Sequence, residues 1–202
     1  MTRRGNPGTR EEWLEAATRE IGQQFADRGS PLPPGVRVTC GWPSGKALSG
    51  RIGEAWSPLA STTGSHETFI SPICDDPVQV VSTLVHELCH HAAGIQAGHG
   101  PEFGKLARSF GLVGKLTATT AGPGVTAWVA EFVARVGPYP HGRLDPGKSG
   151  KKKQTTRMLK VTCPACGYTV RTTAQWLAVG LPTCPCGAEM VAALPSGTDP
   201  DE

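Results

Sequence analysis

Two histidines and a glutamate near the middle of the chain have the spacing of a metal site. His86-Glu87-Leu88-Cys89-His90 is an H-E-x-x-H sequence. On an α-helix, residues four apart project from one face, so His86 and His90 can share one metal ion. Glu87 lies about 100° around the helix from His86, where its carboxylate can reach a water at the metal instead of the metal. The pattern predicts a zinc site with Glu87 as general base.

A zinc ion that activates water needs a third protein ligand. Ala93 and Gln96 stand where the extended metzincin pattern requires Gly and His, which excludes that pattern. Gly98-His99-Gly100 follows shortly after, and its glycines let the chain turn back and present His99 to the metal. Glu102 is the competing candidate, although a carboxylate in the first turn of a helix also stabilises that helix without a metal. His99 is the preferred third ligand.

Four of the seven cysteines form a second candidate metal site near the C-terminus. Cys163 and Cys166 form a C-x-x-C pair, and 17 residues separate it from the C-x-C pair of Cys184 and Cys186. Paired cysteines at this distance are typical of a structural zinc ribbon, in which the ion supplies folding energy that a short segment lacks. The short second pair leaves open whether both of its cysteines bind zinc. A redox-active pair is the alternative, but no thioredoxin-like pattern surrounds it.

Positive charge is concentrated around the same cysteines. Residues 1–145 hold 13 basic and 13 acidic side chains, residues 146–188 hold seven basic and no acidic ones, and residues 189–202 hold four acidic ones. Basic side chains neutralise phosphates and aromatic rings stack on bases, so the segment is expected to bind nucleic acid. The candidate residues are Lys151, Lys152, Lys153, Arg157, Lys160, Arg171, Tyr168 and Trp176. A charged linker before a purely structural ribbon is the alternative.

The other three cysteines, Cys40, Cys74 and Cys89, are scattered through the first part of the chain. The odd total of seven cysteines and the lack of an apolar signal segment indicate a reducing compartment, so we expect a cytoplasmic protein. A Cys40–Cys74 disulfide is left as an alternative. No apolar run approaches the roughly 18 residues of a membrane helix, and this excludes a membrane-spanning protein.

Local patterns place the histidines in an α+β fold. A capping box at Thr9 begins an amphipathic helix, and short strands are predicted over 36–41, 51–56 and 68–73. Asp76-Pro77 begins the helix that carries H-E-x-x-H, and later helices begin at Gly100-Pro101 and near Val125. The residues expected in the core include Trp42, Trp56 and Trp128. The predicted organisation is a domain over 1–145, a basic linker over 146–158, a zinc ribbon over 159–192 and an acidic tail over 193–202.

H-E-x-x-H, the following Gly98-His-Gly-Pro-Glu-Phe103 and the cysteine-paired ribbon together resemble the SprT-like metalloproteins. That family includes bacterial SprT, phage-encoded relatives and the Spartan-type proteases, and the resemblance covers residues 65–190. It implies a zincin-like domain, a small sheet packed on helices, with zinc on His86, His90 and His99. Spartan-type members are DNA-dependent proteases that degrade DNA-crosslinked proteins, whereas bacterial members are less clearly enzymes.

Two functions are therefore weighed. The first is a zinc endopeptidase that acts on DNA-associated or DNA-crosslinked proteins, with one catalytic and one structural zinc ion, single-stranded DNA as the favoured nucleic acid and a monomeric chain. The alternative is a non-catalytic zinc protein, a nucleic-acid or transcription-associated factor that keeps the same fold. Glu87 favours the enzyme, because a purely structural metal site needs no general base.

Overall fold

The computed structural model describes residues 7–44, 50–148 and 158–192. The chain forms two compact units, Met1–Ser149 and Gly150–Glu202, each with a hydrophobic cluster of its own. Helices and small sheets occur in both units, which confirms the α+β fold class. Among the described residues, no helix is long and apolar enough to cross a membrane.

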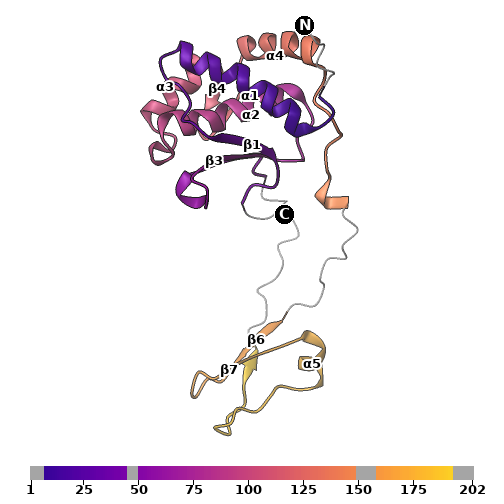
Figure 1. Ribbon diagram of the computed structural model, residues 1–202. Helices are drawn as coiled ribbons and strands as arrows, with labels where there is room; N and C mark the ends of the chain where they lie inside the picture. Colours follow the sequence, from indigo (N-terminus) through magenta and orange to yellow (C-terminus); the bar gives the residue numbers. More distant parts are fainter. Residues whose placement is uncertain (1–6, 45–49, 149–157, 193–202) are drawn as a thin grey trace. The chain divides into compact units, whose positions relative to one another are not determined.

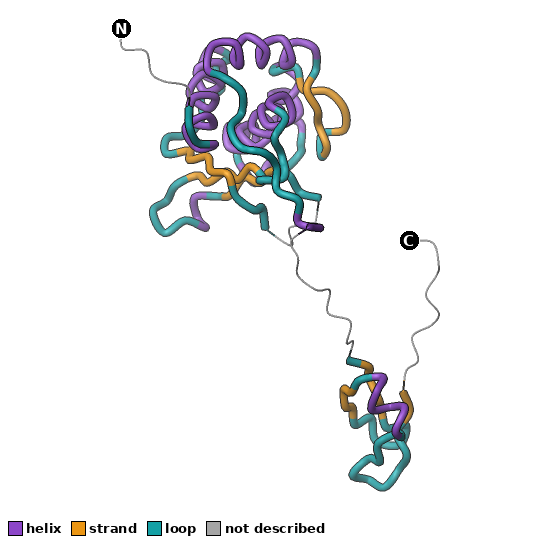
Figure 2. The backbone as a smooth tube through the Cα atoms, turned by 90° about the vertical axis from the view of Figure 1, so that its right-hand side faces the viewer, coloured by secondary structure: helices purple, strands orange, loops and turns teal. Residues whose placement is uncertain are grey.

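The first unit contains a three-stranded sheet covered by helices. Its elements are α1 (Arg10–Asp27), β1 (Val36–Cys40), β2 (Gly53–Trp56), the 3-10 helix η1 (Pro58–Ala60), β3 (His66–Ile70), α2 (Pro77–Ala93), η2 (Ile95–Ala97), α3 (Pro101–Ser109), β4 (Leu112–Lys115), β5 (Ala118–Ala121), α4 (Pro123–Val136) and η3 (Pro146–Lys148). β3 is the central strand, parallel to β1 and antiparallel to β2. Helices α1 to α4 gather on one side of this sheet (Figures 1 and 2).

α1 begins at the capping box that the sequence predicts. The Thr9 hydroxyl accepts a hydrogen bond from the Glu12 N–H at 3.2 Å, and the Glu12 carboxylate accepts from the N–H groups of Thr9 and Gly8 at 3.0 and 2.8 Å. The apolar face of α1, with Trp13 and Phe25 fully buried, lies in the main core. The local cap and the buried stripe therefore act together to define this helix.

α2 is the central helix of the first unit. Asp76 caps it by accepting a hydrogen bond from the Gln79 N–H at 2.8 Å, and Pro77 occupies the first turn, as predicted. The helix contacts α1, α3, α4, β2, β3 and β5. Gly94 ends it with a φ of 84°, a conformation that favours glycine. A helix packed on so many sides holds its side chains in fixed positions, which a metal site requires.

A hairpin that the sequence analysis does not predict lies between α3 and α4. β4 and β5 pair antiparallel, with Gly114 opposite Thr119. A Cβ at Gly122 would collide with the carbonyl oxygen of Gly111, so the two ends of the hairpin meet only because residue 122 is glycine. β5 contacts α2 and thereby becomes a wall beside the H-E-x-x-H residues.

The expectation that Trp42 and Trp56 lie in the core is wrong. Their exposed fractions are 42% and 38%, whereas Trp128 is partly buried and stacks on Phe132 with 5.1 Å between ring centroids. Trp56 lies on β2 at the edge of the sheet, and its Nε1 donates a hydrogen bond to Glu54 at 3.0 Å. Because the helices cover only one side of the sheet, an aromatic residue on its edge strand stays partly in solvent.

A buried arginine ties the segment after α4 to the rest of the first unit. The Arg10 guanidinium donates hydrogen bonds to the carbonyl oxygens of Pro72, Pro140 and Gly142 at 3.4, 3.4 and 2.7 Å. The Leu144 N–H donates to the same Pro72 carbonyl at 2.9 Å. These contacts fix residues 140–144 against the loop that follows β3.

The second unit is a small antiparallel sheet with one short helix. Its elements are β6 (Leu159–Thr162), β7 (Thr169–Thr172), α5 (Ala174–Val179) and β8 (Val191–Ala192), with strand order β7-β6-β8. Its buried residues are Val161, Cys163, Cys184 and Met190. Two of these four are cysteines, so the apolar core is small for an independent fold. Most of the predicted basic linker and the whole acidic tail (149–157 and 193–202) lie outside the described residues.

Candidate metal centres

Three imidazoles meet where α2 ends. His86 and His90 project from α2, and His99 approaches from the turn between η2 and α3. One nitrogen of each ring lies within 4.8 Å of the others, and Nε2 of His86 is 3.2 Å from Nε2 of His99. These are the three ligands that the sequence predicts. Glu102, the competing candidate, is exposed in the first turn of α3 and does not belong to this cluster.

Glycines return the chain so that His99 faces α2. Gly94 and Gly98 have φ values of 84° and 51°, in the region that other residues rarely adopt. The Gly100 N–H then donates to the Ala97 carbonyl at 3.0 Å, and α3 begins at Pro101. The sharp turn that the flanking glycines indicated is therefore the element that delivers the third imidazole.

Phe103 of α3 forms an apolar support for all three imidazoles. Its side chain is fully buried, and its ring centroid lies 4.8, 4.4 and 4.9 Å from those of His86, His90 and His99. Packing against one rigid ring restricts the orientation of each imidazole. The sequence predicts that Phe103 is buried on a helix face, but not that it contacts the whole cluster.

The electrostatics and spacing of the cluster are compatible with zinc. Burial, with the charges of the neighbouring imidazoles, lowers the pKa of His86 and of His90 to about 4, so both rings are neutral at physiological pH. Neutral imidazole is the form that binds a metal. Zinc–nitrogen bonds of about 2.0–2.1 Å in a tetrahedron place two ligand nitrogens about 3.3 Å apart. The 3.2 Å between His86 and His99 fits that spacing.

Glu87 lies beside the imidazoles and outside the ligand cluster. It is only 7% exposed and lines the same cleft as His86 and His90. Burial, with the negative charge of Glu54, raises the pKa of Glu87 to about 8. A carboxyl group in this position can hold and release a proton at the cleft surface.

Gly53 of β2 is a site residue that no sequence pattern indicates. A Cβ at this position would lie 2.5 Å from Cγ2 of Thr83 and 2.6 Å from Oε1 of Glu87. Side chains essentially never approach this closely, so β2 reaches α2 at Glu87 only because residue 53 is glycine. The contact joins residues 34 positions apart in the chain.

A cleft of about 600 Å³ lies over these residues. Residues 50–55 form one wall, residues 117–120 form the other, and His86, Glu87 and His90 lie between them. Within the described chain, β2 pairs with β3 alone and is an edge strand of its sheet. An edge strand beside a cleft can pair with an extended peptide.

The neighbours His91 and Cys89 face away from the cluster. His91 is 4% exposed, with its Nε2 2.8 Å from the Thr68 hydroxyl and its Nδ1 3.1 Å from Nδ1 of His66. Cys89 is fully buried in the core. Cys40, Cys74 and Cys89 are all free thiols, so the alternative Cys40–Cys74 disulfide is not formed.

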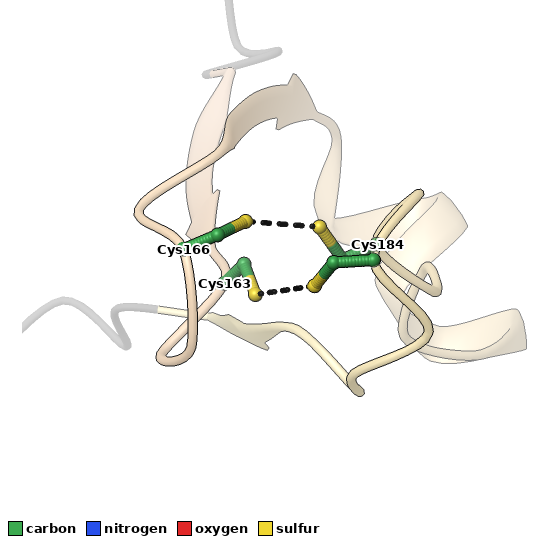
Figure 3. Close-up of side chains that lie close together, drawn as sticks. Cys163, Cys166 and Cys184 are labelled. Atoms are coloured by element: carbon green, nitrogen blue, oxygen red, sulfur yellow. Dashed lines mark hydrogen bonds between the residues drawn. The ribbon is translucent and has the colours of Figure 1, made fainter.

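The four cysteines of the second unit form the other candidate centre. Their Sγ atoms lie within 4.8 Å of one another. The two loops point their thiols toward each other (Figure 3), with 3.6 Å between Cys163 and Cys186 and 3.5 Å between Cys166 and Cys184. Zinc–sulfur bonds of about 2.3 Å in a tetrahedron place sulfurs about 3.8 Å apart. Both Cys184 and Cys186 are therefore close enough to bind the same ion.

The two cysteine loops differ by one residue in their turns. In the first, the Gly167 N–H donates to the Cys163 carbonyl at 3.0 Å, and in the second the Gly187 N–H donates to the Cys184 carbonyl at 2.8 Å. The backbone N–H of Cys166 is the largest influence that lowers the pKa of the Cys163 thiol to about 7, whereas burial and hydrogen bonds with the other ribbon thiols raise the pKa of Cys184 to about 12. A lowered pKa favours the thiolate, which is the form that binds metal.

Four of the eight predicted nucleic-acid-binding residues lie in the described part of the second unit. Lys160 of β6 lies directly opposite Arg171 of β7, and both are exposed. Tyr168 and Trp176 are 50% and 62% exposed on the same unit. The other candidates lie outside the described residues: Lys151, Lys152, Lys153 and Arg157.

The hairpin supplies a contact that sequence reasoning misses. The Thr119 hydroxyl of β5 lies 2.8 Å from Nδ1 of His86, and 33 positions separate the two residues. Short motifs carry no signal for such a contact, because it depends on how the hairpin packs on α2.

The two centres differ in their donors and surroundings: three imidazoles in an open cleft, and four thiols in a small ribbon. Both could hold a metal ion, and both are compatible with zinc. The chain matches no protein-family model, no curated protein and no solved structure.

Proposed function

We propose that this chain is a zinc-dependent endopeptidase of the SprT-like type, in which a zincin-like catalytic unit is followed by a zinc ribbon. The observation that carries the proposal is the convergence of His86, His90 and His99 in a cleft that Glu87 also lines. A closed structural metal site needs neither an open cleft nor a buried carboxyl group beside its ligands. The pairing of these features supports hydrolysis over a purely structural role.

The three imidazoles hold the ion, and the residues around them fix the imidazoles. When bound, zinc supplies a Lewis acid that polarises a peptide carbonyl and makes water a stronger nucleophile at neutral pH. Phe103 restricts the ring orientations, and α2 keeps His86 and His90 one turn apart. The chain thus presents three nitrogen donors from one rigid cluster.

Glu87 is the general base of the proposed reaction. Its carboxylate takes a proton from the water whose oxygen attacks the carbonyl carbon. When the C–N bond breaks, Glu87 delivers that proton to the leaving nitrogen. Burial raises the pKa of Glu87 to about 8, and the positive charge of a zinc ion on the three imidazoles would lower it again, into the range that suits a group that must both take and return a proton.

The walls of the cleft favour a protein substrate. An extended peptide can lie along the edge strand β2, with backbone hydrogen bonds supplying affinity for any sequence. Ile52, Ala55 and Ala118 on these walls are small or apolar, and the charged residues Arg51 and Glu54 of the same wall form an ion pair with each other. A cleft with these walls is suited to many polypeptides.

The second unit is proposed to anchor the enzyme to DNA. Like charges directly opposite each other on neighbouring strands repel, and a phosphate between Lys160 and Arg171 relieves that repulsion. The exposed rings of Tyr168 and Trp176 can stack on unpaired bases, which favours single-stranded DNA. The substrates proposed on this basis are proteins bound or crosslinked to DNA.

The enzyme proposal is tested by proteolysis of a DNA-bound protein, with and without single-stranded DNA. We expect the wild-type chain to cleave it, and Glu87→Gln to cleave at least about 100-fold more slowly, since positioned proton transfer contributes about 10²–10⁴-fold. Metal analysis is expected to give two zinc ions per chain for both proteins. Glu102→Gln is the matched control, because Glu102 is exposed and outside the ligand cluster.

The outcome that overturns the proposal is absence of cleavage by wild-type protein that carries both ions. A non-catalytic nucleic-acid or transcription-associated factor is then the better description.

The DNA anchor has a separate test by titration with single-stranded DNA at several salt concentrations. Lys160→Ala with Arg171→Ala, and separately Lys151, Lys152 and Lys153 to Ala, should weaken binding and flatten its salt dependence. Lys105→Ala with Lys115→Ala, in the first unit, is the matched control. DNA binding that stays at the wild-type level both in the Lys160 and Arg171 variant and in the variant of the three linker lysines contradicts the anchor.

A further inference from the structure

Thr119 holds the side of the His86 imidazole that faces away from the ligand cluster. Its Oγ1 is 2.8 Å from Nδ1 of His86, while Nε2 of the same ring is 3.2 Å from Nε2 of His99. One ring nitrogen therefore contacts the hydroxyl, and the other points into the space that the three imidazoles share.

The chemistry of neutral imidazole indicates which atom donates this hydrogen bond when the other ring nitrogen binds a metal. Such a ring has one N–H donor and one lone pair, on different nitrogens. For Nε2 to bind a metal, the proton must lie on Nδ1, and a partly buried N–H needs an acceptor. The Thr119 hydroxyl, 2.8 Å from Nδ1, can accept from that N–H, so it satisfies the tautomer in which Nε2 is free to ligate.

The hairpin positions the Thr119 hydroxyl beside α2. Within β5, Thr119 is half-buried, whereas its neighbours Ala118 and Thr120 are exposed, as strand alternation requires. Gly114, opposite Thr119 on β4, has a φ of 93° and lets the short hairpin twist. β5 packs on α2, so the strand and the helix set the distance between Thr119 and His86 together.

We infer that Thr119 is a positioning residue for the metal ligand His86: its hydroxyl accepts the Nδ1 proton and so orients Nε2 toward the metal. The inference rests on the same three-histidine centre as the proposed function. It adds a residue outside H-E-x-x-H, on an element that the sequence analysis does not predict, and its test measures metal binding without any proteolysis.

Three substitutions separate the hydroxyl from the shape of the side chain. Thr119→Val keeps the volume and removes the acceptor, so zinc affinity of the histidine centre should fall about 10- to 100-fold, the usual effect of losing such a partner. Thr119→Ser keeps the hydroxyl and should stay close to the wild-type affinity. Thr120→Val makes the same change at the exposed neighbour on the strand and should leave the zinc affinity of the histidine centre unchanged.

The measurement is zinc content of the full chain, by metal analysis, after dialysis against buffers of graded free zinc. His90→Ala identifies the binding step that belongs to the histidine centre, since it removes a ligand of that centre only. Histidine labelled with nitrogen-15 reports the tautomer of His86 in the zinc-loaded chain by NMR. We expect its Nδ1–H to be protected from exchange in the wild-type and Thr119→Ser proteins, and exposed to exchange in Thr119→Val.

Wild-type affinity and an unchanged Nδ1–H signal in Thr119→Val overturn this inference and leave the proposed function standing. Equal losses in Thr119→Val and Thr119→Ser also overturn it, because the hydroxyl is then not the cause. A wild-type chain with no zinc step sensitive to His90→Ala overturns both the inference and the proposed function.

Discussion

At the scale of single residues, Gly53 determines how close the edge strand comes to the helix that carries Glu87. A methyl group there would meet Thr83 at 2.5 Å and the Glu87 carboxylate at 2.6 Å. The carboxylate therefore has its position because the strand beside it has no side chain at this point. The position of the proposed general base thus depends on the absence of a Cβ at residue 53.

Gly53→Ala is predicted to impair catalysis more than metal binding. The added methyl group must displace Glu87 or push β2 away from α2, so the free energy of unfolding should fall by about 1–3 kcal/mol, as in overpacked cores. Turnover should drop while the zinc content stays at two ions per chain. Denaturant titration, peptidase assay and metal analysis on one preparation check the three quantities.

Gly124→Ala is the control for this substitution. Nothing lies within 4 Å of a Cβ at Gly124, which is in the first turn of α4. The change should leave turnover as it is and alter stability by no more than about 1 kcal/mol. A Gly53→Ala protein that behaves like Gly124→Ala would show that the close approach has no part in placing the base.

Residues that act through short spacing could be predicted from the sequence, and residues that act across the fold could not. His86 and His90 are one helical turn apart, and Gly98 and Gly100 mark the turn that returns His99. Thr119 and Gly53 reach the site from strands 33 and 34 positions away from the residues they contact. Neither threonine nor glycine in such a stretch has a distinctive pattern before the strands are placed.

At the scale of elements, α1 shows how a local cap makes the stability of the fold depend on pH. The N–H groups of Gly8 and Thr9 hold the pKa of Glu12 below its ordinary value of 4.5. A group with a lowered folded-state pKa stabilises the fold above its unfolded value. That contribution is lost as the pH falls through the lower, folded value.

Glu12→Gln is therefore predicted to lower the Tm at pH 7, and its difference from the wild-type Tm should shrink as the pH falls below 4.5. Glutamine keeps an acceptor oxygen but not the charge, so the difference between the two proteins follows ionisation of the carboxylate. Thermal unfolding recorded by circular dichroism between pH 3 and pH 7 gives the comparison. Glu15→Gln changes an exposed residue on the same helix, and its Tm should follow the wild-type Tm over this range. A Tm difference between Glu12→Gln and wild type that does not change with pH would contradict the role of the charge.

Elements with strong end signals were predictable, and the hairpin was not. The capping box at Thr9 and the Asp76-Pro77 start lie at the observed beginnings of α1 and α2. In β4, by contrast, three of four residues are exposed, so the alternation that indicates a strand is missing. Its pairing with β5 depends on packing against α2 and on glycines at close approaches, which appear only in the folded chain.

At the scale of the whole molecule, the two units depend on metal to different extents. The first has a large apolar core that includes Trp13, Phe25 and Phe132, all fully buried. The second has four buried residues, two of them candidate zinc ligands. We therefore predict that its fold relies on a bound ion for energy that apolar burial does not supply.

Removal of zinc by a chelator is predicted to unfold the second unit and to leave the first folded. In two-dimensional amide NMR, the dispersed signals of residues 158–192 should collapse, while those of the first unit shift only around His86, His90 and His99. Cys166→Ser should reproduce the collapse without chelator, and Cys40→Ser should not, because Cys40 is no member of either cluster. Dispersed ribbon signals after complete zinc removal would contradict the prediction.

Because Cys74 and Cys89 are buried, the number of reactive thiols is predicted to report which parts of the chain are folded. Burial raises the pKa of these two thiols to about 11 and about 12, and a protonated thiol does not react. In the metal-loaded chain a thiol reagent therefore meets only Cys40, which is half-buried. Loss of the ribbon ion adds four reactive sulfurs, and only unfolding of the first unit adds the last two, which completes the seven in the chain. A colorimetric thiol assay thus distinguishes three states of this molecule, at one, five and seven equivalents.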